Sequence, residues 1–188
     1  AVLAEEIETP GEGQIKAMIT IAGNPVLSAP DGDRLDRALA GVGFMVSIDP
    51  YLNETTRHAD VILPPPPPSR SPHFDFALNA LAVRNNARYS PPVLPLKTGP
   101  DEAEILARIA LVLYGVGVGA DPALVDEQVI ATTLAKETAD AASPVTGRAV
   151  DELTAMLEDG PGYERRLDMM LRLGAYGDAF GARTEGLT

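Results

Sequence analysis

The chain has 188 residues, of which 45% are hydrophobic, and this is enough to bury the core of one domain with an extension. Its formal net charge of −12 argues against nucleic acids and acidic membrane surfaces as partners. The sequence contains no cysteine, which excludes disulfides and thiolate metal sites, and no apolar run is long enough to span a membrane. The absence of cysteine does not fix the compartment; we expect a cytoplasmic protein without a membrane-spanning segment and without a nucleic-acid partner.

The first half of the chain has the order strand, helix, strand. Residues 15–22 are predicted as a strand, 23–32 as a polar loop, 33–40 as a helix and 44–48 as a second strand. This order is typical of a βαβ unit, whose strands are parallel. Because near-continuous apolar strands belong to sheets covered by helices on both faces, we predict a three-layer α/β fold with a mostly parallel, Rossmann-like sheet.

The second strand ends at Asp49, and a third apolar run follows at residues 61–63, where five prolines at 64–68 terminate it. In parallel sheets, ligands bind beyond the carboxyl ends of the strands, which is where Asp49 lies. Its carboxylate can accept hydrogen bonds from the ribose or base of a nucleotide, or it can cap the turn that follows. We expect Asp49 to be the main ligand-binding residue.

Polar residues in the two loops that follow these strands are further candidates. Gly23 allows the backbone to approach a ligand closely, and Asn24 either contacts a nucleotide or stabilises a turn before Pro25. In the second loop, Glu54 and Thr55 either bind phosphate or guanine, or form capping hydrogen bonds. The negative net charge opposes loose capture of a polyanion, so backbone amides and helix N-termini would have to hold a pyrophosphate.

Beyond residue 119 the sequence shows helical patterns and loops but no strand pattern. The helices are predicted at residues 123–139, 150–157 and 163–173. We therefore divide the chain into an α/β domain, 1–118, and a helical extension, 119–188, that leads toward a further domain. The last segment, 175–188, is rich in glycine and has few large apolar side chains, so we expect it to be poorly ordered.

The chain offers little for catalysis of its own. His58 and His73 are its two histidines, and without cysteine partners they make a poor metal site. No order of serine, histidine and acid supports a nucleophilic triad. We expect no catalytic residue and no metal ligand in this chain.

The candidate residues belong to motifs that follow one another in a fixed order. These are Gly23-Asn24-Pro25, the strand-end acid Asp49, the turn Asn53-Glu54-Thr55, and Ala-Asp-Val-Ile-Leu-Pro at 59–64. The combination resembles the molybdopterin oxidoreductase family, the group that contains formate dehydrogenases, nitrate reductases and dimethyl sulfoxide reductase. The resemblance covers roughly residues 1–115 and rests on the order of the motifs, because Gly-Asn-Pro alone is uninformative.

This resemblance implies a much longer, four-domain parent enzyme, a molybdopterin-dependent oxidoreductase. In the family, two α/β domains each hold one half of a bis-(molybdopterin guanine dinucleotide) cofactor, and the metal ligand lies in an earlier domain. The chain then corresponds to the third domain, excised from its parent. The implied cofactor-binding residues are Gly23, Asn24, Pro25, Asp49, Glu54 and Thr55.

The excised domain is expected to be inactive by itself, to bind no cofactor, and to have the other domains of the parent chain as its partners. Respiratory complex I contains a subunit of the same lineage without the cofactor, so a non-catalytic scaffold domain is the alternative. An NAD-binding or deaminase-like α/β domain is a third candidate, which the lack of a G-x-G-x-x-G loop weakens. The motifs do not indicate a substrate or an oligomeric state.

Overall fold

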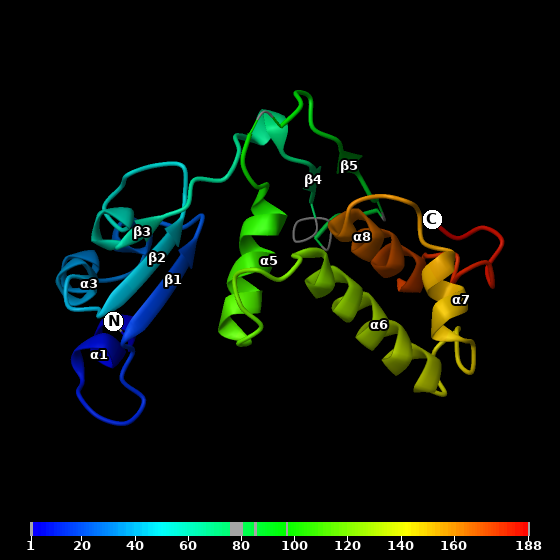
Figure 1. Ribbon diagram of the computed structural model, residues 1–188, viewed down its shortest axis with the longest axis horizontal. Coiled ribbons are helices and arrows are strands. Elements are labelled where there is room, and N and C mark those ends of the chain that lie inside the picture. The colour runs from blue at the N-terminus through cyan, green and yellow to red at the C-terminus, as the bar shows by residue number, and fades with distance from the viewer. Residues whose placement is uncertain (1, 76–80, 85, 97, 188) are drawn as a thin grey trace. The chain divides into compact units, whose positions relative to one another are not determined.

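The computed structural model describes residues 2–75, 81–84, 86–96 and 98–187 (Figure 1). The chain forms two units, Ala1–Ile105 and Leu106–Thr188, and each is described by itself. The predicted division between residues 118 and 119 stays a proposal, based on the change from α/β to helical sequence.

The first unit contains a three-stranded parallel sheet in the order β1-β2-β3 (Figure 1). The strands are β1 (Ala17–Ile21), β2 (Phe44–Ile48) and β3 (Val61–Ile62). In this register Ile19 lies opposite Val46, and Val46 lies opposite Val61. The parallel sheet and the helix between β1 and β2 confirm the predicted Rossmann-like α/β fold.

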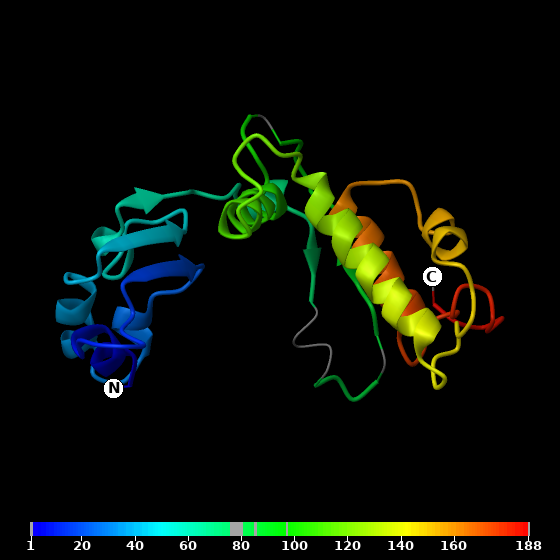
Figure 2. The ribbon, with the colours of Figure 1, turned by 60° about the horizontal axis from the view of Figure 1, so that its bottom comes forward.

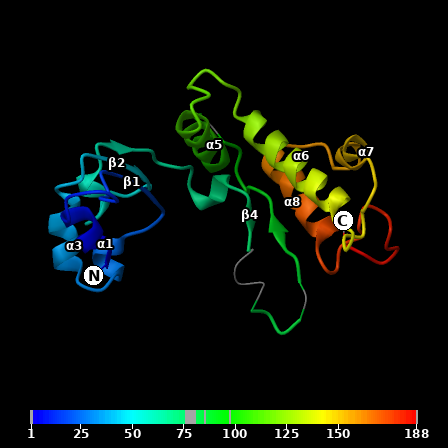
Figure 3. The same cartoon turned by 90° about the horizontal axis from the view of Figure 1, so that it is seen from below.

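Two helices cover one face of this sheet, α1 (Val2–Glu8) and α3 (Gly32–Leu39), as Figure 3 shows. Leu35 and Leu39 project from α3 at helical spacing, and both are buried. The core of the unit contains the buried side chains Ala4, Ile7, Leu35, Ala38, Leu39 and Met45. This core fixes the βαβ unit and with it the positions at which β1 and β2 end.

The opposite face of the sheet is apolar and partly exposed, although Ile48 on this face is buried. Strand residues alternate between faces, and Ile19, Ile21, Phe44 and Val61 are 40 to 52% exposed. The helices α1 and α3 therefore form the one helical layer that packs on the sheet. A second helical layer on the opposite face, as a three-layer fold requires, stays a prediction.

After β3 the chain runs through the prolines into a short 3₁₀ turn, η2 (Pro68–Arg70). The strands β4 (His73–Phe74) and β5 (Tyr89–Ser90) form an antiparallel pair. The helix α5 (Glu102–Leu113) follows, with acidic residues in its first turn as the helix dipole favours.

The second unit is helical, with α6 (Ala123–Ala139), α7 (Val150–Ala155) and α8 (Gly162–Leu173). These bounds confirm the three predicted helices. Helices α6 and α8 lie side by side (Figure 2). The buried core between the elements consists of Ile130, Leu134, Val145, Leu153, Leu157, Met169 and Phe180.

The segment after α8 is packed, so the prediction of poor order for residues 175–188 is wrong for the described part. Phe180 is 2% exposed and belongs to the core of the second unit. The carboxylate of Asp178 accepts hydrogen bonds from the N–H groups of Phe180 and Gly181, each at 3.0 Å. One large aromatic side chain and one buried acid therefore hold the segment in place.

Hydrogen exchange should distinguish a packed segment 175–187 from a disordered one. The N–H of Ala179 donates to the carbonyl of Arg172 at 3.0 Å, and the N–H of Asp178 donates to that of Leu187 at 2.9 Å. We expect these two amides to exchange as slowly as those in α8, and the amide of the exposed Thr184 to exchange much faster. Fast exchange at all three positions would restore the prediction of a disordered tail.

Among the residues that the structure describes, no helix has the length and apolar character needed to cross a membrane.

Candidate functional site

The candidate site lies where β1 and β2 end. The loop after β1 contains Ala22, Gly23 and Asn24, and the loop after β2 begins at Asp49. The N–H of Ala22 donates to the carbonyl of Ile48 at 2.9 Å, which holds the two loops together at their start. Ala22 has a φ of 48°, in the left-handed region that is strained for alanine.

Three side chains join the two loops. The amide nitrogen of Asn24 donates to Glu54 Oε2 at 2.7 Å, and the hydroxyl of Thr55 donates to Asn24 Oδ1 at 2.7 Å. The hydroxyl of Thr55 also accepts from the N–H of Val26 at 3.1 Å. The structure therefore brings the predicted residues Asn24, Glu54 and Thr55 into one hydrogen-bonded cluster.

The local sequence explains how the first loop reaches this geometry. Pro25 is the first residue of the short helix α2 (Pro25–Ser28), where its missing N–H and fixed φ are favourable. The carbonyl of Asn24 accepts the N–H groups of Leu27 and Ser28. Asn24 thus begins α2 with its backbone and reaches the second loop with its side chain.

Asp49 is 7% exposed, and its carboxylate has partners within its own loop. Oδ1 accepts from the N–H of Tyr51 at 2.8 Å, and Oδ2 lies 3.4 Å from the side-chain nitrogen of Asn53. These contacts correspond to the turn-capping role that the sequence leaves open. A contact between Asp49 and a nucleotide remains a proposal.

Two residues that are not among the predicted binding residues, Asn53 and Thr56, build the second loop. Asn53 Oδ1 accepts from the N–H groups of Thr55 and Thr56 at 2.9 and 3.0 Å. The hydroxyl of Thr56 accepts from the N–H of Asn53 and donates to the carbonyl of Tyr51. An asparagine with threonines two and three residues after it is typical of such side-chain turns, and this pattern is visible in the sequence.

Glu54 and Asn24 differ in exposure from the buried Thr55. Thr55 is fully buried, whereas Glu54 is exposed at the outer side of the cluster. The hydrogen bond from Asn24, followed by a backbone hydrogen bond, lowers the pKa of the Glu54 carboxyl. Glu54 is therefore an ionised acceptor at neutral pH, open to solvent and fixed by one neighbour.

Gly23 occupies a position at which the fold tolerates a side chain. A Cβ at this residue would meet the carbonyl oxygen of Ile21 at 3.6 Å and Pro25 Cδ at 4.0 Å, which are ordinary van der Waals contacts. Gly32, by contrast, would place a Cβ 2.1 Å from the carbonyl oxygen of Val26, so glycine is required there. The fold accounts for Gly32 but not for Gly23.

His58 and His73 have separate environments. His58 lies in η1 (Thr56–His58), and its Nε2 is 2.6 Å from Asp36 Oδ1. His73 lies in β4. Within the described part of the chain, no three histidine or acidic side chains gather as a metal-binding group.

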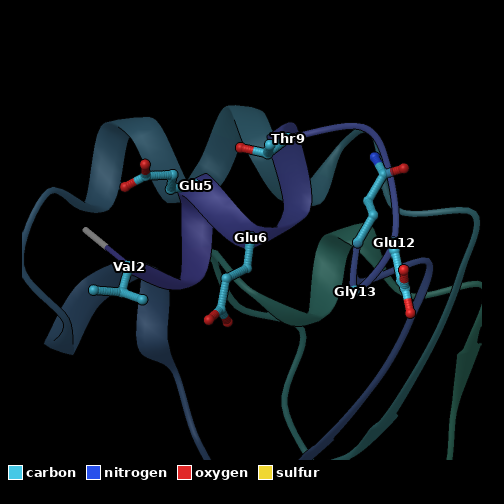
Figure 4. Close-up of a pocket in the computed structure, with 7 residues that line it drawn as sticks. Val2, Glu5, Glu6, Thr9, Glu12 and Gly13 are labelled. Carbon is cyan, nitrogen blue, oxygen red and sulfur yellow. The ribbon is translucent and has the colours of Figure 1, made fainter.

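A surface depression of ≈ 400 Å³ lies beside α1, lined by residues that precede β1, and is separate from the two loops (Figure 4). Its lining includes Glu5, Glu6 and Glu12. Figure 4 shows their carboxylates pointing in different directions. This open acidic surface has none of the predicted site residues, and we assign it no binding role.

No protein-family model matches the chain, and no solved structure does. Over 60 residues it is 38% identical to the assimilatory nitrate reductase catalytic subunit of Bacillus subtilis (strain 168), a stretch that covers 32% of the chain and 8% of that relative. Over 62 residues it is 37% identical to the F420-dependent formate dehydrogenase subunit alpha of Methanocaldococcus jannaschii, covering 33% of the chain and 9% of that relative. The matched stretches are thus less than a tenth of the relatives' length. They support the relationship to molybdopterin oxidoreductases that the motifs indicate.

Proposed function

We propose that this chain is a cofactor-binding part of a molybdopterin-dependent oxidoreductase, and that its two strand-end loops hold one guanine dinucleotide half of a bis-(molybdopterin guanine dinucleotide) cofactor. The observation that carries the proposal is the junction of the loops through Asn24, Glu54 and Thr55. It lies beyond the carboxyl ends of β1 and β2, where parallel sheets bind ligands. The similarity to a nitrate reductase and a formate dehydrogenase subunit supports the same assignment.

The chemistry of the cluster fits a guanine. The guanine edge presents N–H donors, and an ionised carboxylate such as Glu54 can only accept hydrogen bonds. Gly23 leaves the backbone of the first loop accessible at a position where the fold would tolerate a side chain. Glu54 is therefore the base-binding candidate, and Gly23 marks the place of closest backbone approach.

In the whole enzyme the molybdenum centre and its pterins would supply the oxidation–reduction chemistry, and this chain would bind and orient one arm of the cofactor. Asn24 fixes the Glu54 carboxylate by donating to Oε2, and Thr55 fixes Asn24. Asp49 shapes the second loop through the N–H of Tyr51. We assign none of these residues a catalytic step.

A scaffold domain of the same lineage is the second candidate. One observation favours it: Asn24, Thr55 and Asp49 already satisfy one another or their own loops, as a purely structural junction requires. A scaffold would keep these hydrogen bonds but would not need Gly23, because a Cβ fits at that residue. GDP binding by the unaltered chain therefore separates the two functions, and replacing Gly23 tests its part in that binding.

The direct test is a titration of the ¹⁵N-labelled 188-residue chain with GDP, followed by NMR. We expect a dissociation constant of about 0.1–1 mM, because one domain buries only part of the ligand and the net charge opposes a diphosphate. Shifts should concentrate at residues 23–28 and 49–56. ADP should bind more weakly, since adenine lacks the adjacent N1–H and 2-amino donors through which guanine could bind both oxygens of Glu54.

Gly23→Ala should leave thermal melting unchanged within about 1 °C and weaken GDP binding at least roughly fivefold. Gly119→Ala is the matched control, because a Cβ at Gly119 meets no atom within 4 Å, so it too would not clash, and the residue lies far along the sequence from the loops. Equal responses to GDP and ADP, or shifts outside the two loops, would contradict guanine binding. Undisturbed GDP binding in Gly23→Ala would contradict the role of Gly23, and absence of GDP binding by the unaltered chain would favour the scaffold.

A further inference from the structure

Asp36 lies outside both loops but contacts the end of the second one. It is on α3, and its side chain is 29% exposed. Its Oδ1 lies 2.6 Å from Arg57 Nη2 and 2.6 Å from His58 Nε2. Because an ionised carboxylate only accepts, both side chains donate to the same oxygen.

Asp36 and Arg57 stabilise each other's charged form. Hydrogen bonds from Arg57 and then from His58 lower the pKa of Asp36, and Asp36 raises the pKa of Arg57. The Arg57 side chain is 52% exposed, and exposed ion pairs contribute little. The His58 side chain is 14% exposed, so the contact between Asp36 and His58 is the more sheltered of the two.

Arg57 and His58 directly follow the loop after β2, which contains Glu54 and Thr55. The N–H of Arg57 donates to the carbonyl of Asn53 at 3.1 Å, and the N–H of His58 donates to that of Thr55 at 3.1 Å. A displacement of Arg57 and His58 would therefore be passed to Thr55. Thr55 in turn holds the Asn24 side chain.

We propose that Asp36 is a positioning residue of the nucleotide site, which anchors η1 to α3 and thereby keeps Glu54 and Thr55 in register with Asn24. The proposal rests on the proposed function for the identity of the ligand, a guanine nucleotide. Asp36 would act only through the loop. Without the anchor the loop would spend part of its time out of the binding geometry, which weakens apparent affinity by that fraction.

The experiment compares Asp36→Ala with Asp33→Ala in the 188-residue chain. Both changes remove one acid from α3, and Asp33 is exposed in the first turn. In the free protein, the amides of His58 and Ala59 should exchange faster in Asp36→Ala and remain as in wild type in Asp33→Ala. The initial slope of the GDP titration should fall about three- to tenfold in Asp36→Ala and stay within about twofold in Asp33→Ala.

Combining Asp36→Ala with Thr55→Val tests whether Asp36 acts on GDP binding through Thr55. If Asp36 acts through Thr55, adding Asp36→Ala to Thr55→Val should change GDP binding by less than about twofold. An equal loss in both backgrounds would overturn the proposal, as would unchanged binding in Asp36→Ala. If wild type binds no GDP, the guanine proposal fails; faster exchange at His58 would still support Asp36 as the anchor of the loop, and unchanged exchange would overturn that too.

Discussion

Replacing Arg172 with Met should lower the free energy of unfolding of the helical unit by about 3–5 kcal/mol, because it leaves two buried carboxylates without their cation. Arg172 Nε donates to Asp168 Oδ1 at 2.9 Å, and Nη1 donates to Asp178 Oδ2 at 2.9 Å. All three side chains are 10% exposed. Met retains the length and apolar stem of arginine, so the loss reports mainly the missing charge.

The expected loss is large because this ion cluster connects the last helix with the segment that follows it. Asp168 also accepts the N–H of Glu158 at 3.1 Å, and Asp178 holds the backbone at Phe180. The Arg172 guanidinium lies 5.6 Å from the centre of the Phe180 ring. Loss of the cation would therefore loosen both the helix and the core position of Phe180.

Urea unfolding followed by far-ultraviolet circular dichroism would measure this effect. Arg165→Met is the matched control, because Arg165 lies on the same helix, is less buried, and forms no ion pair with the residues that the structure describes. We expect the control to lose less than about 0.5 kcal/mol. A loss below about 1 kcal/mol for Arg172→Met would show that the cluster behaves as an exposed pair.

The elements that the sequence predicts well are those with a complete local signal. β2 and α6 have the predicted bounds, 44–48 and 123–139, because each has a continuous apolar pattern that a turn or breaking residue terminates. The parallel order of the strands follows from the helix between β1 and β2. The meeting of the two loops at the strand ends was predictable for the same reason, and their role as a binding site stays a proposal.

The hydrogen bonds that hold the two loops in place join residues far apart in the sequence, and a single sequence does not show which residues pair. Nothing near Asp36 in the sequence indicates Arg57 or His58, which are more than 20 positions away. Asp49 illustrates the opposite case. Its two possible roles, contact with a nucleotide and capping of the turn, were visible in the sequence, but the hydrogen bonds from Tyr51 and Asn53 to its carboxylate are known only from the folded loop.

The prediction of poor order for residues 175–188 was wrong for the described part because glycine has two physical roles. The prediction took the glycines of this segment as a source of flexibility. In the structure, a Cβ at Gly177 would lie 2.0 Å from the carbonyl oxygen of Leu171, and one at Gly186 would lie 2.2 Å from the backbone of Asp178. These glycines permit backbone segments to approach closely, which only the packed structure reveals.

The two strand-end loops, residues 22–24 and 49–55, allow a second large effect to be predicted. Thr55→Val should destabilise the α/β unit by about 2–4 kcal/mol, because it removes one hydroxyl and leaves two buried or half-buried partners unsatisfied. The hydroxyl accepts the N–H of Val26 at 3.1 Å and donates to Asn24 Oδ1 at 2.7 Å. Valine keeps the branched shape in this fully buried position, so packing changes little.

Two comparisons separate the hydroxyl from other effects of this substitution. Thr55→Ser keeps the hydroxyl and loses one methyl group, and it should lose only about 1 kcal/mol. Thr9→Val makes the same chemical change at an exposed residue of the same unit and should be nearly neutral. Urea unfolding monitored by the amide signals of β1 and β2 would give the stability of this unit separately from that of the helices.

The order of the three variants tests the junction of the loops. If the Thr55 hydroxyl joins the loops, Thr55→Val should lose the most stability, and Asn24 should show the largest change in side-chain amide shift. GDP binding should weaken in Thr55→Val and persist in Thr55→Ser, since only the first releases the Asn24 side chain that holds Glu54. A larger loss in Thr55→Ser than in Thr55→Val would mean that the methyl group, and not the hydroxyl, supports this site.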